Sequence, residues 1–151
     1  MDTLLNDDYF MRIALIEAEK ALEKGEIPIG CVIVSNDLIL AKAHNLTETL
    51  QDVTAHAEMQ AFTSAAAYIG AKYLKDCTLY VTLEPCIMCL GASYWTQITR
   101  IVYGATDKKH IYPIDKKNFL HPKTTITGGV LEKECAEIIS IFFQQKRMVT
   151  S

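Results

Sequence analysis

The rest of this chain is built around two short stretches, His56-Ala57-Glu58 and Pro85-Cys86-Ile87-Met88-Cys89. Together they offer one imidazole, two thiols and one carboxylate. Zinc accepts sulfur and nitrogen ligands tetrahedrally, and three protein ligands leave its fourth position for water, as in catalytic sites. We therefore predict that the histidine and both cysteines bind zinc. The glutamate, two residues after the histidine, is better placed to move protons than to bind the metal.

Apolar patterns on both sides of these stretches predict alternating helices and strands. Two β-branched, apolar runs joined by an Asn36-Asp37 turn predict a β-hairpin. The predicted strands are 29–34, 38–41, 77–83 and 100–104. The predicted helices are 10–22, 55–67, one that begins at Pro85, and one that contains 131–143. Residues 45–53 and 105–123 are polar and are expected to be irregular.

This order of elements predicts an α/β fold, a three-layer α/β/α sandwich around a mixed central sheet. The hairpin would supply antiparallel strands, and the crossovers between later strands would make parallel ones. The chain has 151 residues and half of them are hydrophobic, which is enough for one compact core. We therefore expect a single domain, residues 1–151.

Both halves of the metal site are expected at helix N-termini. Thr54 is a possible N-cap, which would put His56 in the first turn of its helix. Proline is tolerated in a first helical turn, so Pro85 is expected to start the next helix with both cysteines at its N-terminus. There the helix macrodipole and the unpaired amides favour the thiolates that zinc requires.

Charge and cysteine usage indicate the setting in which the protein works. A formal net charge of -3 gives no general attraction to polyanions, although a local basic patch can exist. Cys31, Cys77 and Cys135 have apolar neighbours and are expected to be free core thiols, which fits a reducing compartment. The acidic N-terminus and the absence of about twenty consecutive apolar residues argue against a membrane partner. We therefore expect a soluble cytoplasmic protein.

The two stretches and their surroundings resemble the cytidine deaminase superfamily. Thr54-Ala55-His56-Ala57-Glu58 and residues 79–89 carry the histidine-x-glutamate and proline-cysteine-x-x-cysteine signature of zinc deaminases. They look most like the branch of bacterial tRNA adenosine deaminases and guanine deaminases, over nearly the whole chain, including 27–30 and 128–131. The resemblance implies a cytidine deaminase-like fold and a hydrolytic enzyme that uses Zn²⁺ to remove an exocyclic amine from a nucleobase.

The resemblance also implies roles for single residues. Glu58 would take a proton from the water that zinc activates and deliver it to the ring nitrogen and to the departing ammonia. Asn45, the Ala57 backbone amide, Trp95 and Asp107 are the candidates for substrate binding. Because relatives pair through the helices that flank the zinc site, a homodimer is expected, with Tyr94 and Trp95 as aromatic candidates for its interface.

The segments that would choose the substrate point in two directions. Tyr94-Trp95 is similar to guanine deaminases, and bulky Ile111-Tyr112-Pro113 stands where the tRNA enzymes carry small residues that let an RNA backbone approach. With the acidic net charge, these features favour a small purine base or nucleoside, of guanine or adenine type. The alternative is a deaminase of the tRNA wobble adenosine, favoured by the last helix, 134–147. A local basic cluster also favours it: Lys108, Lys109, Lys116, Lys117 and Lys123.

Three other interpretations of the cysteine pair remain open. A redox dithiol at a helix start would leave His56 and Glu58 without a role. A closed structural zinc site would need a fourth ligand, for which His44 is nearest in the sequence. A noncatalytic, zinc-stabilised binding domain would have no use for the glutamate carboxylate, so its presence favours the enzyme. His110 and His121 are expected to be ordinary loop histidines, with a place in the pocket lining as the alternative.

Overall fold

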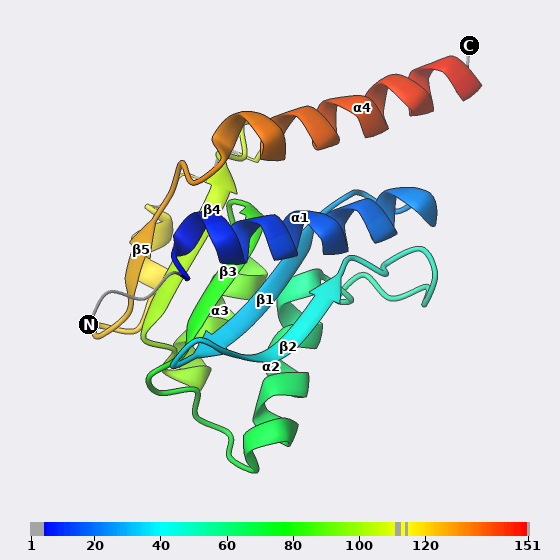
Figure 1. Cartoon of the computed structure of the whole chain (residues 1–151). Helices are drawn as coiled ribbons and strands as arrows, with labels where there is room; N and C mark the ends of the chain where they lie inside the picture. The colour runs from blue at the N-terminus through cyan, green and yellow to red at the C-terminus, as the bar shows by residue number, and fades with distance from the viewer. Residues whose placement is uncertain (1–4, 111–112, 114, 151) are drawn as a thin grey trace.

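The structure is a computed structural model and describes residues 5–110, 113 and 115–150. These residues form a five-stranded sheet covered by helices on both faces (Figure 1). The strands are β1 (Gly30–Ser35), β2 (Leu38–His44), β3 (Thr78–Leu83), β4 (Arg100–Ala105) and β5 (Thr125–Thr127). The helices are α1 (Asp7–Glu23), α2 (Ala57–Ile69), α3 (Ile87–Thr96), α4 (Glu132–Thr150) and the short 3-10 helix η1 (Lys116–Phe119).

The sheet is mixed, as the sequence predicts. Its strand order is β2-β1-β3-β4-β5, and β1 runs antiparallel to both of its neighbours while β3, β4 and β5 run parallel. The β1–β2 hairpin closes at Asn36 and Asp37, whose φ angles of 50° and 64° are the left-handed values of a tight hairpin turn. The crossover through α3 makes β3 and β4 parallel.

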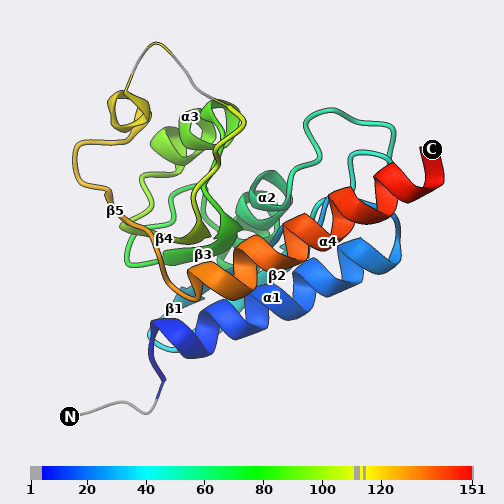
Figure 2. The ribbon, with the colours of Figure 1, turned by 90° about the horizontal axis from the view of Figure 1, so that it is seen from above.

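The helices form a layer on each face of the sheet. Figure 2 shows α1 and α4 side by side on one face and α2 with α3 on the other. The apolar run in β1 allows this, because successive side chains of a strand point to opposite faces. Val32 and Val34 belong to the core under α1 and α4, and Ile33 belongs to the core under α2 and α3. The predicted three-layer α/β/α sandwich is therefore confirmed.

Two glycines let helices rest closely on the sheet. A Cβ atom on Gly30 of β1 would overlap the Ala14 carbonyl group of α1, and one on Gly104 of β4 would overlap the Cys135 side chain of α4. Cys135 is buried in this contact, and the predicted core thiols Cys31 and Cys77 are also buried and free. Close packing at Gly104 brings α4 to the end of β4, next to the site described below.

The start of α2 differs from the predicted one. The helix begins at Ala57, and His56 is its N-cap in extended conformation rather than part of its first turn. Thr54 does not cap the helix, because its hydroxyl and its backbone amide both donate to the Asp52 carboxylate. Thr54 is therefore held within the loop, and His56, the predicted zinc ligand, occupies the N-cap position.

The start of α3 also differs. The helix begins at Ile87 with Cys86 as its N-cap, so Pro85 precedes the helix instead of starting it. Neither the His56 nor the Cys86 side chain makes a capping hydrogen bond to its own helix, which leaves both side chains available to each other. Both cysteines still lie at the helix N-terminus, as predicted.

Between β4 and β5, the described residues of the stretch 106–123 are irregular apart from η1, and β5 follows as a strand that the sequence pattern does not reveal. Ile111 and Tyr112, on which part of the substrate prediction rests, lie outside the described residues. Among the helices of the described chain, none is long and apolar enough to cross a membrane.

Candidate metal centre and active site

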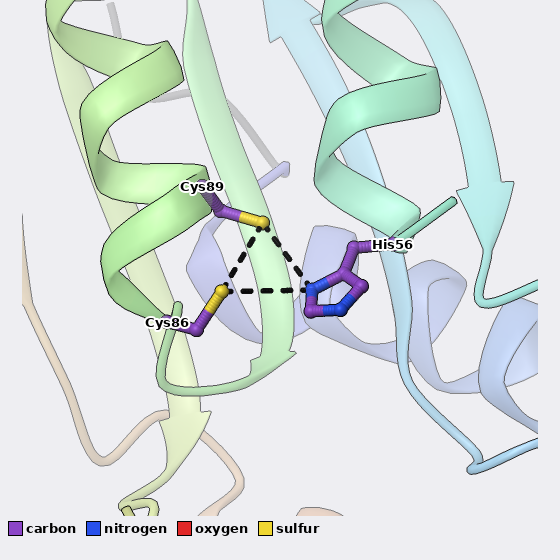
Figure 3. A group of neighbouring side chains, drawn as sticks. All are labelled: His56, Cys86 and Cys89. Atoms are coloured by element: carbon purple, nitrogen blue, oxygen red, sulfur yellow. Dashed lines mark hydrogen bonds between the residues drawn. The ribbon is translucent and has the colours of Figure 1, made fainter. Parts of the chain in front are cut away.

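Figure 3 shows His56, at the N-terminal end of α2, facing the two cysteines at the N-terminal end of α3. The His56 Nδ1 atom lies 3.6 Å from each sulfur atom, and the Cys86 and Cys89 sulfur atoms are 3.8 Å apart. A tetrahedral zinc ion with bonds of ~2.3 Å to sulfur and ~2.0 Å to nitrogen needs ligands separated by roughly 3.5 to 3.8 Å. The three donors therefore fit zinc both in spacing and in chemistry.

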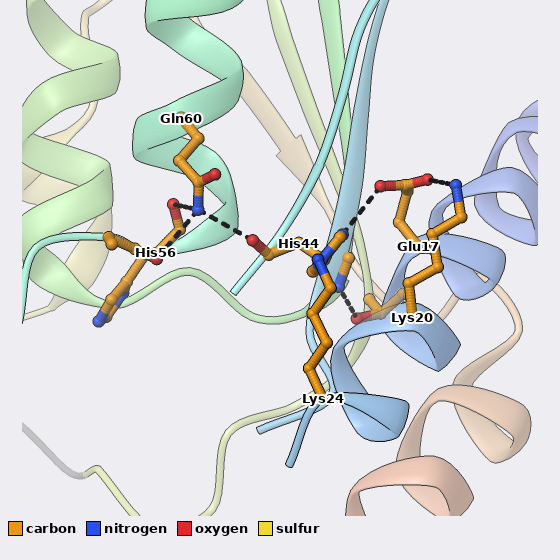
Figure 4. Close-up of polar contacts among 9 residues, drawn as sticks. Glu17, Lys20, Lys24, His44, His56 and Gln60 are labelled. Carbon is orange, nitrogen blue, oxygen red and sulfur yellow. Dashed lines mark hydrogen bonds and ion pairs between the residues drawn. The ribbon is translucent and has the colours of Figure 1, made fainter. Parts of the chain in front are cut away.

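His44 is held elsewhere and does not complete a closed site. Its Nδ1 lies 3.1 Å from a Glu17 carboxylate oxygen, and its Nε2 lies 2.9 Å from the Lys24 ammonium group (Figure 4). In the described part of the chain, the cluster of donors spaced to hold a metal contains His56 and the two cysteines alone. His44 therefore does not close a structural zinc site. Three protein ligands leave the fourth position open, which is typical of catalytic zinc.

The Gln60 side chain holds the loop that carries the histidine ligand. Its amide nitrogen donates to the carbonyl oxygens of His44 and Ala55, at 2.9 and 3.1 Å, and lies 3.5 Å from that of His56 (Figure 4). These contacts join the last residue of β2 to the start of α2. The position of His56 is therefore fixed from the side of the sheet as well as by its own helix.

The pKa values of the two thiols in the cluster are shifted in opposite directions. The pKa of Cys86 is lowered to about 4, first by its hydrogen bond with Cys89 and then by His56, against the effect of burial. The pKa of Cys89 is raised, chiefly because that thiol shares the hydrogen bond with Cys86 and is also buried. One proton thus serves both sulfur atoms. A zinc ion in its place would stabilise both thiolates with positive charge.

Glu58 is a carboxyl group removed from water. Its residue is only 4% exposed, and burial, followed by the negative charge of Cys86, raises its pKa to about 7. A carboxyl group with a pKa near the working pH can both accept and release a proton, which is what a general acid/base requires. The structure places it beside the metal cluster, on the same cavity.

A cavity of about 610 Å³ opens onto this cluster. Its volume lies within the range of small-molecule binding sites. Asn45, His56, Ala57, Glu58, Cys86 and Asp107 line it. The structure thus brings together three of the four predicted substrate-binding residues with the predicted acid/base and two of the predicted ligands.

Trp95 is the predicted substrate residue that the structure does not bring to the cavity. Its side chain is 76% exposed on α3, with its ring 5.4 Å from that of Tyr94. Neither loop histidine belongs to the metal cluster. His110 does line the cavity, where it contacts Asp107, whereas the ring of His121 lies 5.5 Å from that of Tyr94.

Asn45 enters the cavity wall directly after β2. Its backbone amide donates to the Ile29 carbonyl oxygen at 3.0 Å, which anchors the residue, and it is 4% exposed. Its side-chain contacts are longer: the amide nitrogen lies 3.4 Å from the Ile27 carbonyl oxygen, and the amide oxygen 3.4 Å from the Thr47 nitrogen. The side chain can exchange such weak contacts for hydrogen bonds to a nucleobase.

Asp107 forms the opposite rim. Its carboxylate accepts from the Lys109 backbone amide at 3.0 Å and lies 2.8 Å from the His110 Nδ1 atom. Burial by itself would raise the pKa of Asp107, but the hydrogen bonds from His110 and the Lys109 amide outweigh it and lower the pKa. Asp107 is therefore a carboxylate at neutral pH and can accept hydrogen bonds from a ligand.

The sequence interpretation missed several residues of the cavity wall. Ile139 and Phe143 reach it from α4, and the Lys109 ammonium lies 3.2 Å from the centre of the Phe143 ring. Glu84, directly before Pro85, also lines it. The apolar face of the last helix is visible in the sequence, but its contact with the cavity depends on the close packing at Gly104, which no local pattern reveals.

Fold, donor set and buried carboxyl group together define a zinc-binding deaminase. The sequence profile of the cytidine and deoxycytidylate deaminase zinc-binding region matches residues 5–105, and the chain belongs to that family. It is a hydrolytic deaminase with zinc as its cofactor, as the sequence predicts.

Proteins similar to this chain include two kinds of deaminase. A tRNA-specific adenosine deaminase of Aquifex aeolicus (strain VF5) is 43% identical over 147 residues, which cover 95% of this chain and 97% of that protein. A solved structure from work on A-to-I editing by tRNA:A34 deaminases superposes with a TM-score of 0.78 at 38% identity, over 86% of this chain and 98% of that one. The guanine deaminase of Bacillus subtilis superposes with a TM-score of 0.65 at 40% identity, over 68% and 66%.

Proposed function

We propose that the protein deaminates the wobble adenosine of tRNA to inosine. The observation that carries this proposal is the match, over almost the full length of both chains, to a tRNA-specific adenosine deaminase at 43% identity. The likeness to a guanine deaminase is similar in identity but covers only about two thirds of each chain. The comparisons therefore support the alternative substrate prediction better than the preferred one, a small purine base or nucleoside.

One feature that favoured a small purine loses weight in the structure, because Trp95 stands outside the cavity. The net charge of -3 describes the whole chain, whereas phosphate groups within about 10 Å respond to local charges. Lys108 and Lys109 line the cavity mouth, where they can attract the phosphate groups beside a bound nucleotide.

In the proposed mechanism, His56, Cys86 and Cys89 hold the zinc ion. When bound, zinc lowers the pKa of water and so supplies hydroxide at neutral pH. Glu58 holds the proton that water loses, passes it to the ring nitrogen of adenine, and then assists the departure of ammonia. The Asn45 side chain and the backbone amide of Ala57 orient the base by hydrogen bonds.

The other parts of the proposal concern the molecule in its setting. We infer a homodimer, for which the exposed Tyr94 and Trp95 on α3 provide aromatic surface of the kind enriched at interfaces. A tRNA substrate also agrees with the predicted cytoplasmic location. Residues 1–151 would act as one domain.

A panel of substrates tests the proposed function. Zinc-loaded protein is given an anticodon stem-loop with adenosine at the wobble position, and separately adenosine, adenine, guanine and cytidine, and ammonia release is followed. The stem-loop should be turned over fastest, with a rate that falls steeply as salt is added, because phosphate contacts are screened. Faster release from guanine would replace the proposal with the second candidate, a guanine deaminase. The Glu58→Ala variant controls for other sources of ammonia.

A further inference from the structure

Glu84 and Lys116 form a largely buried ion pair beside the metal centre that none of the roles above uses. The Lys116 ammonium lies 3.6 Å from a Glu84 carboxylate oxygen, and their side chains are 16% and 20% exposed. Glu84 follows the end of β3 and directly precedes Pro85, whereas Lys116 is the first residue of η1. The pair therefore joins two segments that are far apart in the sequence.

Glu84 ties the turn that leads to the cysteine ligands to the rim that carries Asp107. Its backbone amide donates to the Ala105 carbonyl oxygen at 2.8 Å. Its second carboxylate oxygen accepts from the Asp107 backbone amide at 3.1 Å. The side chain thus uses one oxygen for the substrate rim and the other for Lys116. The Asp107 turn cannot move away from β3 without breaking this contact.

Lys116 reaches the peptide group immediately before the first cysteine ligand. Its ammonium donates to the Pro85 carbonyl oxygen at 3.3 Å, in addition to facing Glu84. Its place at the start of η1 is fixed by Asp115, the N-cap of η1, whose side chain accepts from the Lys117 backbone amide. One ammonium group therefore holds both the carboxylate and the peptide that leads into Cys86.

We propose that Glu84 and Lys116 are positioning residues that keep the cysteine turn and the Asp107 rim in register, so that metal and substrate meet in the correct geometry. Removing residues that hold metal ligands in place commonly lowers metal affinity or activity by about ten- to a hundredfold. Lys117 offers a matched comparison, because it is the neighbouring lysine, carries the same charge and has an exposed side chain.

The first arm of the test measures the metal and does not depend on the substrate. Zinc-loaded wild type, Lys116→Met and Lys117→Met are mixed with an excess of a chromogenic chelator, and the rate of zinc transfer is recorded. Lys116→Met should release zinc about tenfold faster than wild type, since the turn before Cys86 loses its anchor, and Lys117→Met should match wild type. Equal release from all three proteins would contradict the proposal.

The second arm measures turnover and rests on the proposed function only for its substrate, the anticodon stem-loop. Lys116→Met and Glu84→Gln should each lose about tenfold in kcat/KM, and the double variant should lose no more than either, because both break one pair. Glu84→Gln keeps an oxygen for the Asp107 amide, whereas Glu84→Ala loses that contact and should also raise KM. Lys116→Arg should recover most of the activity.

Losses that add in the double variant, or a fall in melting temperature without change in kinetics or zinc release, would show that the pair is merely structural. Glu84→Gln keeps the comparison possible if Lys116→Met does not fold. A wild-type protein that fails to deaminate the stem-loop would refute the proposed function but not the positioning proposal. In that case the zinc-transfer arm still decides, and the kinetic arm uses the base that the protein does deaminate.

Discussion

The chemistry of this protein is decided by a few side chains taken out of water. Glu58 is almost fully buried and has a pKa of about 7, while Cys86 beside it has a pKa of about 4. The three zinc donors could be predicted from residue types and spacing, and the zinc deaminase signature supports the acid/base role of Glu58. That His56 and Cys86 are N-caps could not be predicted, because the pattern offers Thr54 as a preferred cap and its hydroxyl instead donates to Asp52.

Replacing Glu58 tests its role as acid/base. Glu58→Gln keeps the shape of the side chain but cannot carry a proton between water and the base, so turnover should fall by about a hundredfold or more. Zinc content, measured by elemental analysis, should remain that of wild type. Glu19→Gln, an exposed change on α1, serves as control and should keep full activity. Substantial turnover by Glu58→Gln would remove the residue from the mechanism.

Replacing one cysteine tests the ligand set. Cys86→Ala leaves two of the three protein ligands, so the purified protein should contain much less zinc and should unfold at a lower temperature. Cys77→Ala removes a buried thiol that is not part of the cluster and should keep the zinc content of wild type. If both variants kept the same zinc content, the assigned ligands would be wrong.

The elements of the fold are set mainly by patterns that the sequence shows. The hairpin turn at Asn36-Asp37 and the uninterrupted apolar run of β1 predict a strand pair covered on both faces, as found. β5 escaped prediction because three residues are too few for an alternation pattern, and it exists only through pairing with β4. The approach of α4 to the cavity depends on long-range packing in the same way.

The N-terminus of α1 is fixed to the sheet by a polar contact whose effect depends on pH. Both oxygens of the Asp7 carboxylate accept from the Arg100 guanidinium, at 2.8 and 2.6 Å, and the Tyr80 hydroxyl donates to the same group. The hydrogen bond from Arg100 lowers the pKa of Asp7 from its usual 3.8, against the effect of burial. A carboxylate whose pKa is lower in the folded state stabilises the fold above its unfolded pKa.

Asp7→Asn should therefore be less stable than wild type at pH 7, by roughly 1 kcal/mol, since the pair is partly exposed. The difference should shrink as the pH falls below about 4, where the carboxylate is protonated and its contribution is lost. Urea unfolding of both proteins at several pH values measures the difference in free energy of unfolding. Both proteins have the same metal site, so its contribution cancels in this difference. Asp8→Asn, in the same helical turn but exposed, should show a smaller effect at pH 7. A difference that stays constant with pH would contradict this account.

At the scale of the whole molecule, the surface outside the cavity predicts self-association. Tyr94 and Trp95 are 40% and 76% exposed on α3. Exposure of this aromatic surface to water is unfavourable, and pairing with a second chain would bury it. Light scattering at micromolar concentration should give the mass of a dimer for wild type and of a monomer for Trp95→Glu. Ile16→Glu, an exposed apolar position on α1, should remain dimeric. A monomeric wild type would contradict the prediction.

Substrate choice is the property that the sequence could predict least. Net charge is an average over 151 residues, whereas a phosphate group at the cavity would meet the local charge of Lys108 and Lys109, which line it. Tyr94-Trp95 is similar to guanine deaminases, whereas the last helix is similar to the tRNA enzymes, so the two segments do not select one substrate. Reaction type is read from a handful of atoms around a metal ion, but substrate class is distributed over the cavity wall, the loop after β4 and α4.

The central claim, that this zinc deaminase acts on the wobble adenosine of tRNA, is tested most directly by one measurement. A tRNA with adenosine at the wobble position is incubated with the zinc-loaded protein, cleaved to short fragments, and each fragment is analysed by mass spectrometry for inosine. We expect inosine at the wobble position, other adenosines unchanged, and no inosine with Glu58→Gln. An unmodified wobble adenosine, from protein that releases ammonia from a free purine, would contradict it.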